Sequence, residues 1–185
     1  DVLRQPLEEG CVRVARAART VCFPARFMLI GAMNPCPCGY HGDSSRACRC
    51  SPLQIARYES RLSGPLRDRM DLSIVVSALP ARELGTSPGG ESSSAIRARV
   101  LSARARQLAR DGRLNAQLKG RALRARTPLD GASRRMFEGA LTRLALTARG
   151  HDRVLRVART IADLESADAI TSTHLGEALQ FRGEY

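Results

Sequence analysis

The sequence predicts an α/β region followed by an all-helical region. Two short apolar runs, 27–33 and 72–76, are typical of buried strands in a parallel sheet. A segment rich in Pro, Gly and Ser interrupts the chain at 81–94, and apolar residues recur with helical spacing beyond it. We therefore expect a partial α/β domain over 1–80, a linker, and an all-α domain over 95–185.

Local signals define the elements of the α/β region. A helix or helix end opens the chain, and the period-two alternation of residues 12–16 (VRVAR) is typical of a hairpin strand. The run 27–33 ends at Asn34, so a polar side chain stands at the C-terminal tip of a strand, where ligands bind in open α/β sheets. A helix is expected over 52–62, with Ser51 as its N-cap and a proline at its first position.

Helical periodicity defines the second region. In residues 95–110, four aliphatic side chains are expected to face a core, with arginines around the rest of the helix: Ile96, Val100, Leu101 and Leu108. The last helix has Thr171 as a candidate N-cap, but His174 stands where a capping box has an acid. Further helices are expected over 130–147, 150–165 and 171–181.

The chain is strongly basic, with a net charge of +12 from 30 basic and 18 acidic residues. Residues 91–135 carry 12 basic and 3 acidic side chains, a net charge of +9, whereas residues 1–80 carry 11 and 7, a net of +4. Such a surface suits nucleic acid, because neutralised phosphates release counterions. A merely solvated basic face is the alternative. The candidate nucleic-acid contacts are Arg97, Arg104, Arg106, Arg110 and Arg113.

Two C-x-C pairs, separated by nine residues, lie in a loop over 36–50 that has almost no apolar side chains. Clustered cysteines in a cytosolic protein are more often metal ligands than disulfides, and four thiolates suit tetrahedral Zn²⁺. His41 could replace one thiolate; a reduced, metal-free loop and an adventitious disulfide are the alternatives. Cys11 and Cys22 have apolar neighbours and are expected in the core. The candidate ligands are Cys36, Cys38, Cys48 and Cys50.

Residues 63–72 (SGPLRDRMDL) place two arginines and two acids in a tight Gly-Pro turn. Local salt bridges at a helix end are one explanation, and in solvent they contribute about 0–1 kcal/mol. An arginine finger that reaches a γ-phosphate held by a neighbouring subunit is the other. The chemistry of the residues alone leaves both open.

Four segments resemble, in the right order, signature blocks of magnesium-chelatase-like AAA+ ATPases of the ComM/YifB group. They are residues 1–10, 31–40 (GAMNPCPCGY), 63–72 and 156–164 (RVARTIADL). Residues 104–118 resemble the C-terminal helical domain of the same group, so the likeness runs over nearly the whole chain. The resemblance implies the second half of a P-loop AAA+ core followed by an α-helical lid and C-terminal domain.

The resemblance also implies roles for single residues. Asn34 matches sensor 1, which positions the attacking water near the γ-phosphate, and Arg69 matches an arginine finger acting in trans. Sensor 2 would be Arg149 or Arg153, although both could simply line a basic helix face. Arg67 departs from the group's pattern, which usually has an apolar residue there.

No G-x-x-x-x-G-K-[ST] loop occurs in these 185 residues, and no acidic Walker B strand precedes Asp1. The chain therefore reads as a piece of something longer, and alone it is expected neither to bind ATP tightly nor to hydrolyse it. No signal peptide is visible in these residues, and no run of 18 apolar residues occurs, which argues against a transmembrane helix.

For the intact protein, the resemblance implies a bacterial cytoplasmic homo-hexamer that uses ATP and Mg²⁺ and works on DNA, as a helicase or in branch migration, during natural transformation and recombination. Two alternatives stay open. The chain could be a stand-alone zinc-containing nucleic-acid-binding module, or part of a magnesium chelatase that acts on a porphyrin.

Overall fold

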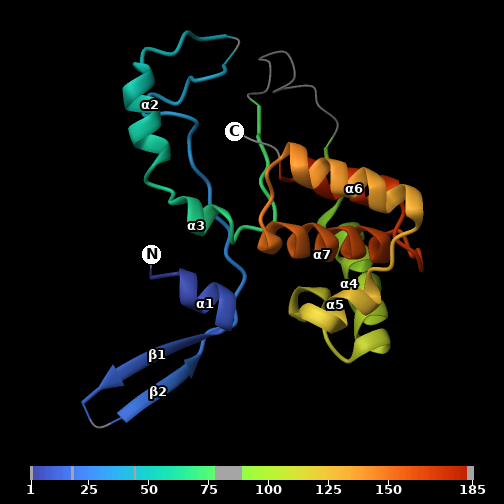
Figure 1. The fold of residues 1–185 in the computed structure, drawn as a ribbon. Helices are drawn as coiled ribbons and strands as arrows, with labels where there is room; N and C mark the ends of the chain where they lie inside the picture. Colours follow the sequence, from blue (N-terminus) through green and yellow to red (C-terminus); the bar gives the residue numbers. More distant parts are fainter. Residues whose placement is uncertain (1, 18, 44, 78–88, 183–185) are drawn as a thin grey trace. The chain divides into compact units, whose positions relative to one another are not determined.

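The computed structural model consists of two compact units (Figure 1). The first comprises the residues up to Met70 together with 75–77, and the second comprises Asp71–Ile74 and the helices from Ser93 onward. The linker predicted over 81–94 falls mostly outside the described residues. The structure describes residues 2–17, 19–43, 45–77 and 89–182.

The first unit opens with a helix and a β-hairpin (Figure 1). The helix α1 (Arg4–Glu9) ends at Gly10, whose φ of 69° is left-handed, a conformation that favours glycine. The strands β1 (Cys11–Arg16) and β2 (Arg19–Pro24) pair antiparallel. The alternation over residues 12–16 thus predicted this hairpin correctly.

The hairpin contributes little to a core. Apart from the half-buried Cys11, every residue of the two strands is exposed. The prediction that Cys11 and Cys22 are core residues is wrong, since Cys22 is exposed. A two-stranded sheet has an interior only where a second layer covers one face, and apolar neighbours in the sequence cannot supply that layer.

The predicted helix after the cysteine loop is confirmed, three residues shorter than expected. The helix α2 (Pro52–Glu59) begins with a capping box, in which the Ser51 hydroxyl accepts from the Gln54 N–H and the Gln54 side chain accepts from the Ser51 N–H. A further single-turn helix, α3 (Gly64–Arg67), was not predicted.

The prediction of two buried strands, over 27–33 and 72–76, is wrong. Neither segment forms a strand, and the hairpin is the only sheet among the described residues. Their side chains are largely exposed, with Met28 at 82%, Ile30 at 80% and Val76 at 87%. An apolar run shows that side chains favour an interior, but a strand also needs a neighbouring strand for its backbone N–H and C=O groups.

The regular elements of the second unit are all helices, as predicted for residues 95–185. The four expected helices are present with ends shifted by a few residues, whereas a short 3₁₀ turn and α5 were not predicted. The prediction that the aliphatic side chains of 95–110 face the core is wrong: Ile96, Val100, Leu101 and Leu108 are 41–54% exposed. The buried residues of this helix are Ala103 and Gln107. The elements are α4 (Ser93–Asp111), the 3₁₀ turn η2 (Asn115–Gln117), α5 (Gly120–Arg126), α6 (Gly131–Arg143), α7 (Ala148–Leu164) and α8 (Ser172–Gln180).

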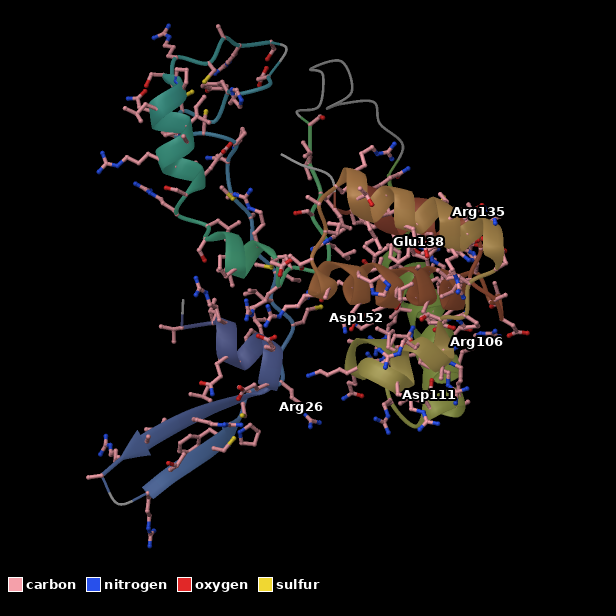
Figure 2. The ribbon with its side chains drawn as sticks, in the orientation of Figure 1. Arg26, Arg106, Asp111, Arg135, Glu138 and Asp152 are labelled. Carbon is pink, nitrogen blue, oxygen red and sulfur yellow. The ribbon has the colours of Figure 1, made fainter. Side chains whose placement is uncertain are left out.

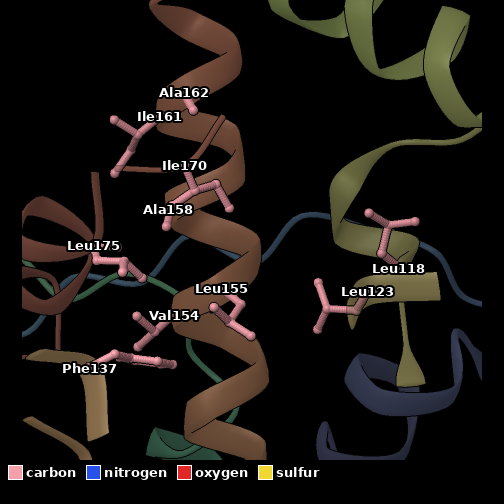
Figure 3. Close-up of a cluster of buried hydrophobic side chains, with 11 residues drawn as sticks. Leu118, Leu123, Phe137, Val154, Leu155, Ala158, Ile161, Ala162, Ile170 and Leu175 are labelled. Atoms are coloured by element: carbon pink, nitrogen blue, oxygen red, sulfur yellow. The ribbon is translucent and has the colours of Figure 1, made fainter. Parts of the chain in front are cut away.

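The core of the second unit forms around α7 (Figure 3). The helices α4, α5 and α8 pack against α7, and α6 packs against α8. Burial of each large aliphatic side chain contributes roughly 1.5–3 kcal/mol, so this stripe of α7 is a main source of the unit's stability. The buried stripe comprises Val154, Leu155, Ala158, Ile161 and Ala162.

The predicted Thr171 cap of α8 is confirmed, and His174 takes the place of the acid that completes a capping box. The Nδ1 atom of His174 accepts from the Thr171 N–H at 3.0 Å, as the acid of a capping box would. Its Nε2 atom lies 2.9 Å from the Glu165 carboxylate, which orients the ring.

Candidate functional site

The four cysteines of the 36–50 loop converge on one point. The Sγ–Sγ distances are 3.3 Å for Cys36–Cys38, 3.7 Å for Cys36–Cys48 and 3.6 Å for Cys38–Cys48. All four sulfurs, including that of Cys50, lie within 4.8 Å of one another. Zn–S bonds of about 2.3 Å in a tetrahedron give S–S edges of about 3.8 Å, so the cluster has the size of a zinc tetrathiolate. A disulfide would need about 2.05 Å.

Backbone amides point at these sulfurs. The N–H groups of Arg49 and Tyr40 donate to Cys38 and lower its thiol pKa to about 6. Burial raises the pKa of Cys50 to about 12. Thiolates are the metal-binding form, and N–H groups around them are what a metal–thiolate centre needs in its outer shell.

The loop reaches this geometry through a tight turn. Gly39 has a φ of 84°, and its N–H donates to the carbonyl of Cys36 at 3.0 Å, which folds the first C-x-C pair back on itself. The side chain of His41 does not join the cluster found among the described residues; only its backbone N–H donates to Cys36. The donor set therefore fits Zn²⁺ with four cysteines.

Arg69, the candidate arginine finger, lies just beyond α3 and is folded onto its own unit. Its guanidinium pairs with the Glu8 carboxylate and donates to the Pro65 carbonyl at 2.7 Å. The side chain is only 11% exposed, whereas the neighbouring Arg67 is exposed. The arginine is thus held in one position, near the start of the chain, by a carboxylate of α1.

Asn34, the candidate sensor 1, is exposed at the end of the extended segment 27–33. Its carboxamide lies beside the cysteine turn, because a Cβ on Gly39 would come within 3.9 Å of Asn34 Nδ2. Asn34 and the cysteine cluster are therefore neighbours in space as well as in sequence.

The two candidate sensor 2 residues differ in their surroundings. Arg149 is exposed near the start of α7, whereas Arg153 is buried one turn later. The Nη1 atom of Arg153 lies 2.6 Å from the Asp71 carboxylate, and this ion pair attaches Asp71–Ile74 to the second unit together with the bond from the Ser73 N–H to the Phe181 carbonyl. Arg153 therefore already has a carboxylate partner.

The five candidate nucleic-acid arginines fall into two groups. Arg97, Arg104 and Arg113 are exposed. Arg106 pairs with Asp168 at 2.7 Å, and Arg110 forms a two-pronged pair with Asp163 at 2.7 and 2.9 Å. Figure 2 labels Arg106 on the helical unit. Among the residues that the structure describes, only the first group has no ion pair that a ligand would have to break.

Arg110 belongs to a buried polar network centred on Asp163, whose side chain has no solvent exposure. The Asn115 amide donates to Asp163 at 2.8 Å and to Thr160 at 3.1 Å, and Arg159 lies 3.2 Å from the same carboxylate. Burial opposes ionisation, but these donors hold the pKa of Asp163 below its ordinary value. The network joins α4 and η2 to α7.

We expect Asp163→Ala to destabilise the helical unit by about 3–5 kcal/mol, because it leaves the buried guanidiniums without their counter-charge. Urea unfolding followed by circular dichroism measures this loss. Asp168→Ala is the matched control, since its carboxylate is fully exposed, and it should change the unfolding midpoint little. Equal effects of the two substitutions would contradict a stabilising role of the network.

The hairpin carries a basic surface that was not predicted from the sequence. Arg13, Arg16 and Arg19 are exposed on its strands, and Arg26 (Figure 2) is exposed just beyond them. The stem of Arg26 packs against Gly10, where a Cβ would lie 3.2 Å from its Cγ. The alternating arginines of the first strand could have indicated this surface. A net charge counted over 80 residues hides it, because acidic residues elsewhere in the same range offset the arginines.

The helices in the part of the chain that the structure describes are all too short or too polar to cross a lipid bilayer.

Comparison with known proteins gives matches along almost the whole chain. Residues 1–84 match the family described as magnesium chelatase, subunit ChlI, and residues 90–182 match its C-terminal family. The chain is 44% identical to the competence protein ComM of Haemophilus influenzae over 183 residues. It is 43% identical over 184 residues to the protein YifB of Escherichia coli, and 44% identical over 184 residues to that of Salmonella typhimurium. Each match covers 98% of this chain and 36% of the relative, so the chain spans about a third of their length.

Proposed function

Because the chain belongs to the magnesium-chelatase-like AAA+ family, in the group of ComM and YifB, we propose that it forms part of a ring-shaped ATPase that acts on DNA. The observation that carries the proposal is the 44% identity to the competence protein ComM over 98% of this chain. The work on DNA would be strand separation or branch migration during uptake and recombination, in the bacterial cytoplasm. The ring would be a homo-hexamer.

In this proposal the chain supplies four parts of the ATPase. Asn34 acts as sensor 1, Arg69 as the finger that reaches the nucleotide of a neighbouring subunit, and Arg149 or Arg153 as sensor 2. The fourth part is a structural zinc centre at the cysteine loop. ATP and Mg²⁺ would be held chiefly by a phosphate-binding loop that these 185 residues do not contain.

The exposed apolar segments support the proposal. Segments 27–33 and 72–76 carry several side chains that are more than half exposed, among them Met28, Ile30 and Val76. Exposed apolar surface of this extent is typical of a site that contacts further protein. The sequence pattern of a parallel sheet in both segments is consistent with completion by strands from the ATP-binding part of the family's fold.

A strand-displacement assay tests the proposal. We expect a complete ATPase that contains this chain to displace a labelled strand from forked DNA when ATP and Mg²⁺ are present, and to show ATP turnover that rises with DNA. The control is the same protein with a non-hydrolysable nucleotide. Absence of both displacement and DNA-stimulated turnover would contradict the proposal.

Two rival functions give different results. A magnesium chelatase would insert Mg²⁺ into a porphyrin, which the absorption spectrum of the porphyrin reports, and would ignore DNA. A zinc-containing binding module would bind nucleic acid, but the complete protein would show no ATP turnover. The four-cysteine cluster favours this module over the chelatase as the second candidate.

A further inference from the structure

A shallow groove of about 420 Å³ lies between the cysteine loop and α2. Pro37 of the loop forms one side, and the other consists of Gln54, Arg57, Tyr58 and Arg61. These four residues follow the spacing i, i+3, i+4 and i+7, so they share one side of α2 and its following turn.

We propose that this groove binds single-stranded DNA, with Tyr58 stacking on a base and Arg57 and Arg61 contacting phosphates. The proposal rests on the proposed action on DNA and adds a site and a strand preference to it. An aromatic ring flanked by arginines is the arrangement that single-strand binding uses, since every base offers a π-face and every linkage a phosphate.

The charges and ring contacts of the groove fit this ligand. Arg57 and Arg61 are exposed, and no carboxylate forms an ion pair with either among the described residues. The Arg61 guanidinium lies over the Tyr58 ring, 5.6 Å from its centroid. A base that stacks on this face would displace the guanidinium, which could then contact a phosphate of the same strand. A base in duplex DNA is covered by its neighbours on both faces, so ring stacking selects an unpaired strand.

The groove is also built on a fixed frame. The N-cap Ser51 directly follows Cys50, so the four-cysteine cluster and the capped first turn of α2 restrict the same stretch of backbone. The cap and the cluster therefore fix the backbone that carries Arg57 and Tyr58 before a ligand arrives.

Fluorescence anisotropy of the zinc-loaded chain with labelled oligo-dT and with a duplex of equal length tests the proposal. We expect tighter binding to the single strand. Tyr58→Ala should weaken it roughly 5- to 150-fold, the range for loss of one stacked base. Tyr58→Phe should retain it. The double variant Arg57→Gln/Arg61→Gln should weaken binding and lower the salt slope by about 1.4.

The double variant Arg134→Gln/Arg143→Gln on α6 removes equal charge and should leave affinity nearly unchanged. The groove assignment is overturned if this control loses as much affinity as the groove variant, if duplex binds better, or if Tyr58→Ala binds normally in protein that retains its zinc. It is also overturned if the groove variants change only self-association, which would make the groove a protein contact. In each of these cases DNA-stimulated turnover of the complete ATPase still decides the proposed function independently.

Discussion

Arg69→Ala in a complete ATPase that contains this chain is expected to reduce ATP turnover by roughly 10³-fold or more, with nucleotide binding retained. A finger stabilises charge that develops on the transferring phosphoryl group, so its loss affects the chemical step rather than the ground state. Steady-state turnover and binding of a fluorescent nucleotide, measured on the same preparation, separate the two effects. Arg69→Lys should recover little, because an ammonium lacks the planar fork of the guanidinium.

The contacts of Arg69 make the test sharper. In this structure its guanidinium is paired with Glu8, so the arginine must exchange that carboxylate for a phosphate before it can act. Glu8→Gln should therefore retain turnover, since it removes the competitor and not the finger. Arg67→Ala is the matched control for charge, because this neighbouring arginine is exposed. If Glu8→Gln and Arg69→Ala both lower the melting temperature and both abolish turnover, the pair is structural and the finger assignment fails.

The parts of the fold that were predictable depend on local chemistry. Ser51 and Thr171 were recognisable caps because a hydroxyl next to a helix start has few other roles. The helix α7 was predicted because the periodicity of a helix is a property of one segment. The capping role of His174 was not predicted, because it depends on which ring nitrogen faces Thr171 and on the carboxylate of Glu165, nine residues earlier.

The parts that could not be predicted depend on partners distant in sequence. Segment 27–33 has the composition of a buried strand, but pairing needs a neighbour that composition cannot reveal. Arg110 looked like its exposed neighbours Arg104 and Arg113, and only the fold brings Asp163 to its guanidinium. The four-cysteine cluster was the exception. Both cysteine pairs lie in one short loop, so their clustering in the sequence predicted that the four sulfurs converge.

The purified, reduced chain is expected to contain one equivalent of zinc, and Cys36→Ser should weaken zinc binding by more than about 100-fold. Cys36 is the buried ligand of the cluster, and loss of even an outer-shell partner costs roughly 10–100-fold in metal affinity. Elemental analysis and competition with a chromogenic chelator measure both quantities. Cys22→Ser is the matched control, because this exposed thiol of the hairpin lies outside the cluster.

Removal of the metal should have a local effect. The loop over 36–50 has no Val, Ile, Leu, Met or Phe to hold it together, so chelation should remove the amide chemical-shift dispersion of the loop and loosen the first turn of α2. The helical unit should keep its own unfolding transition, since its core around α7 includes no residue of the loop. A loop that stays ordered in NMR spectra of metal-free, reduced protein would refute the zinc centre. Unfolding of both units on chelation would instead show that their stabilities are linked. A metal site in the first unit contributes no side chain to the core around α7, so on its own it should not stabilise that core.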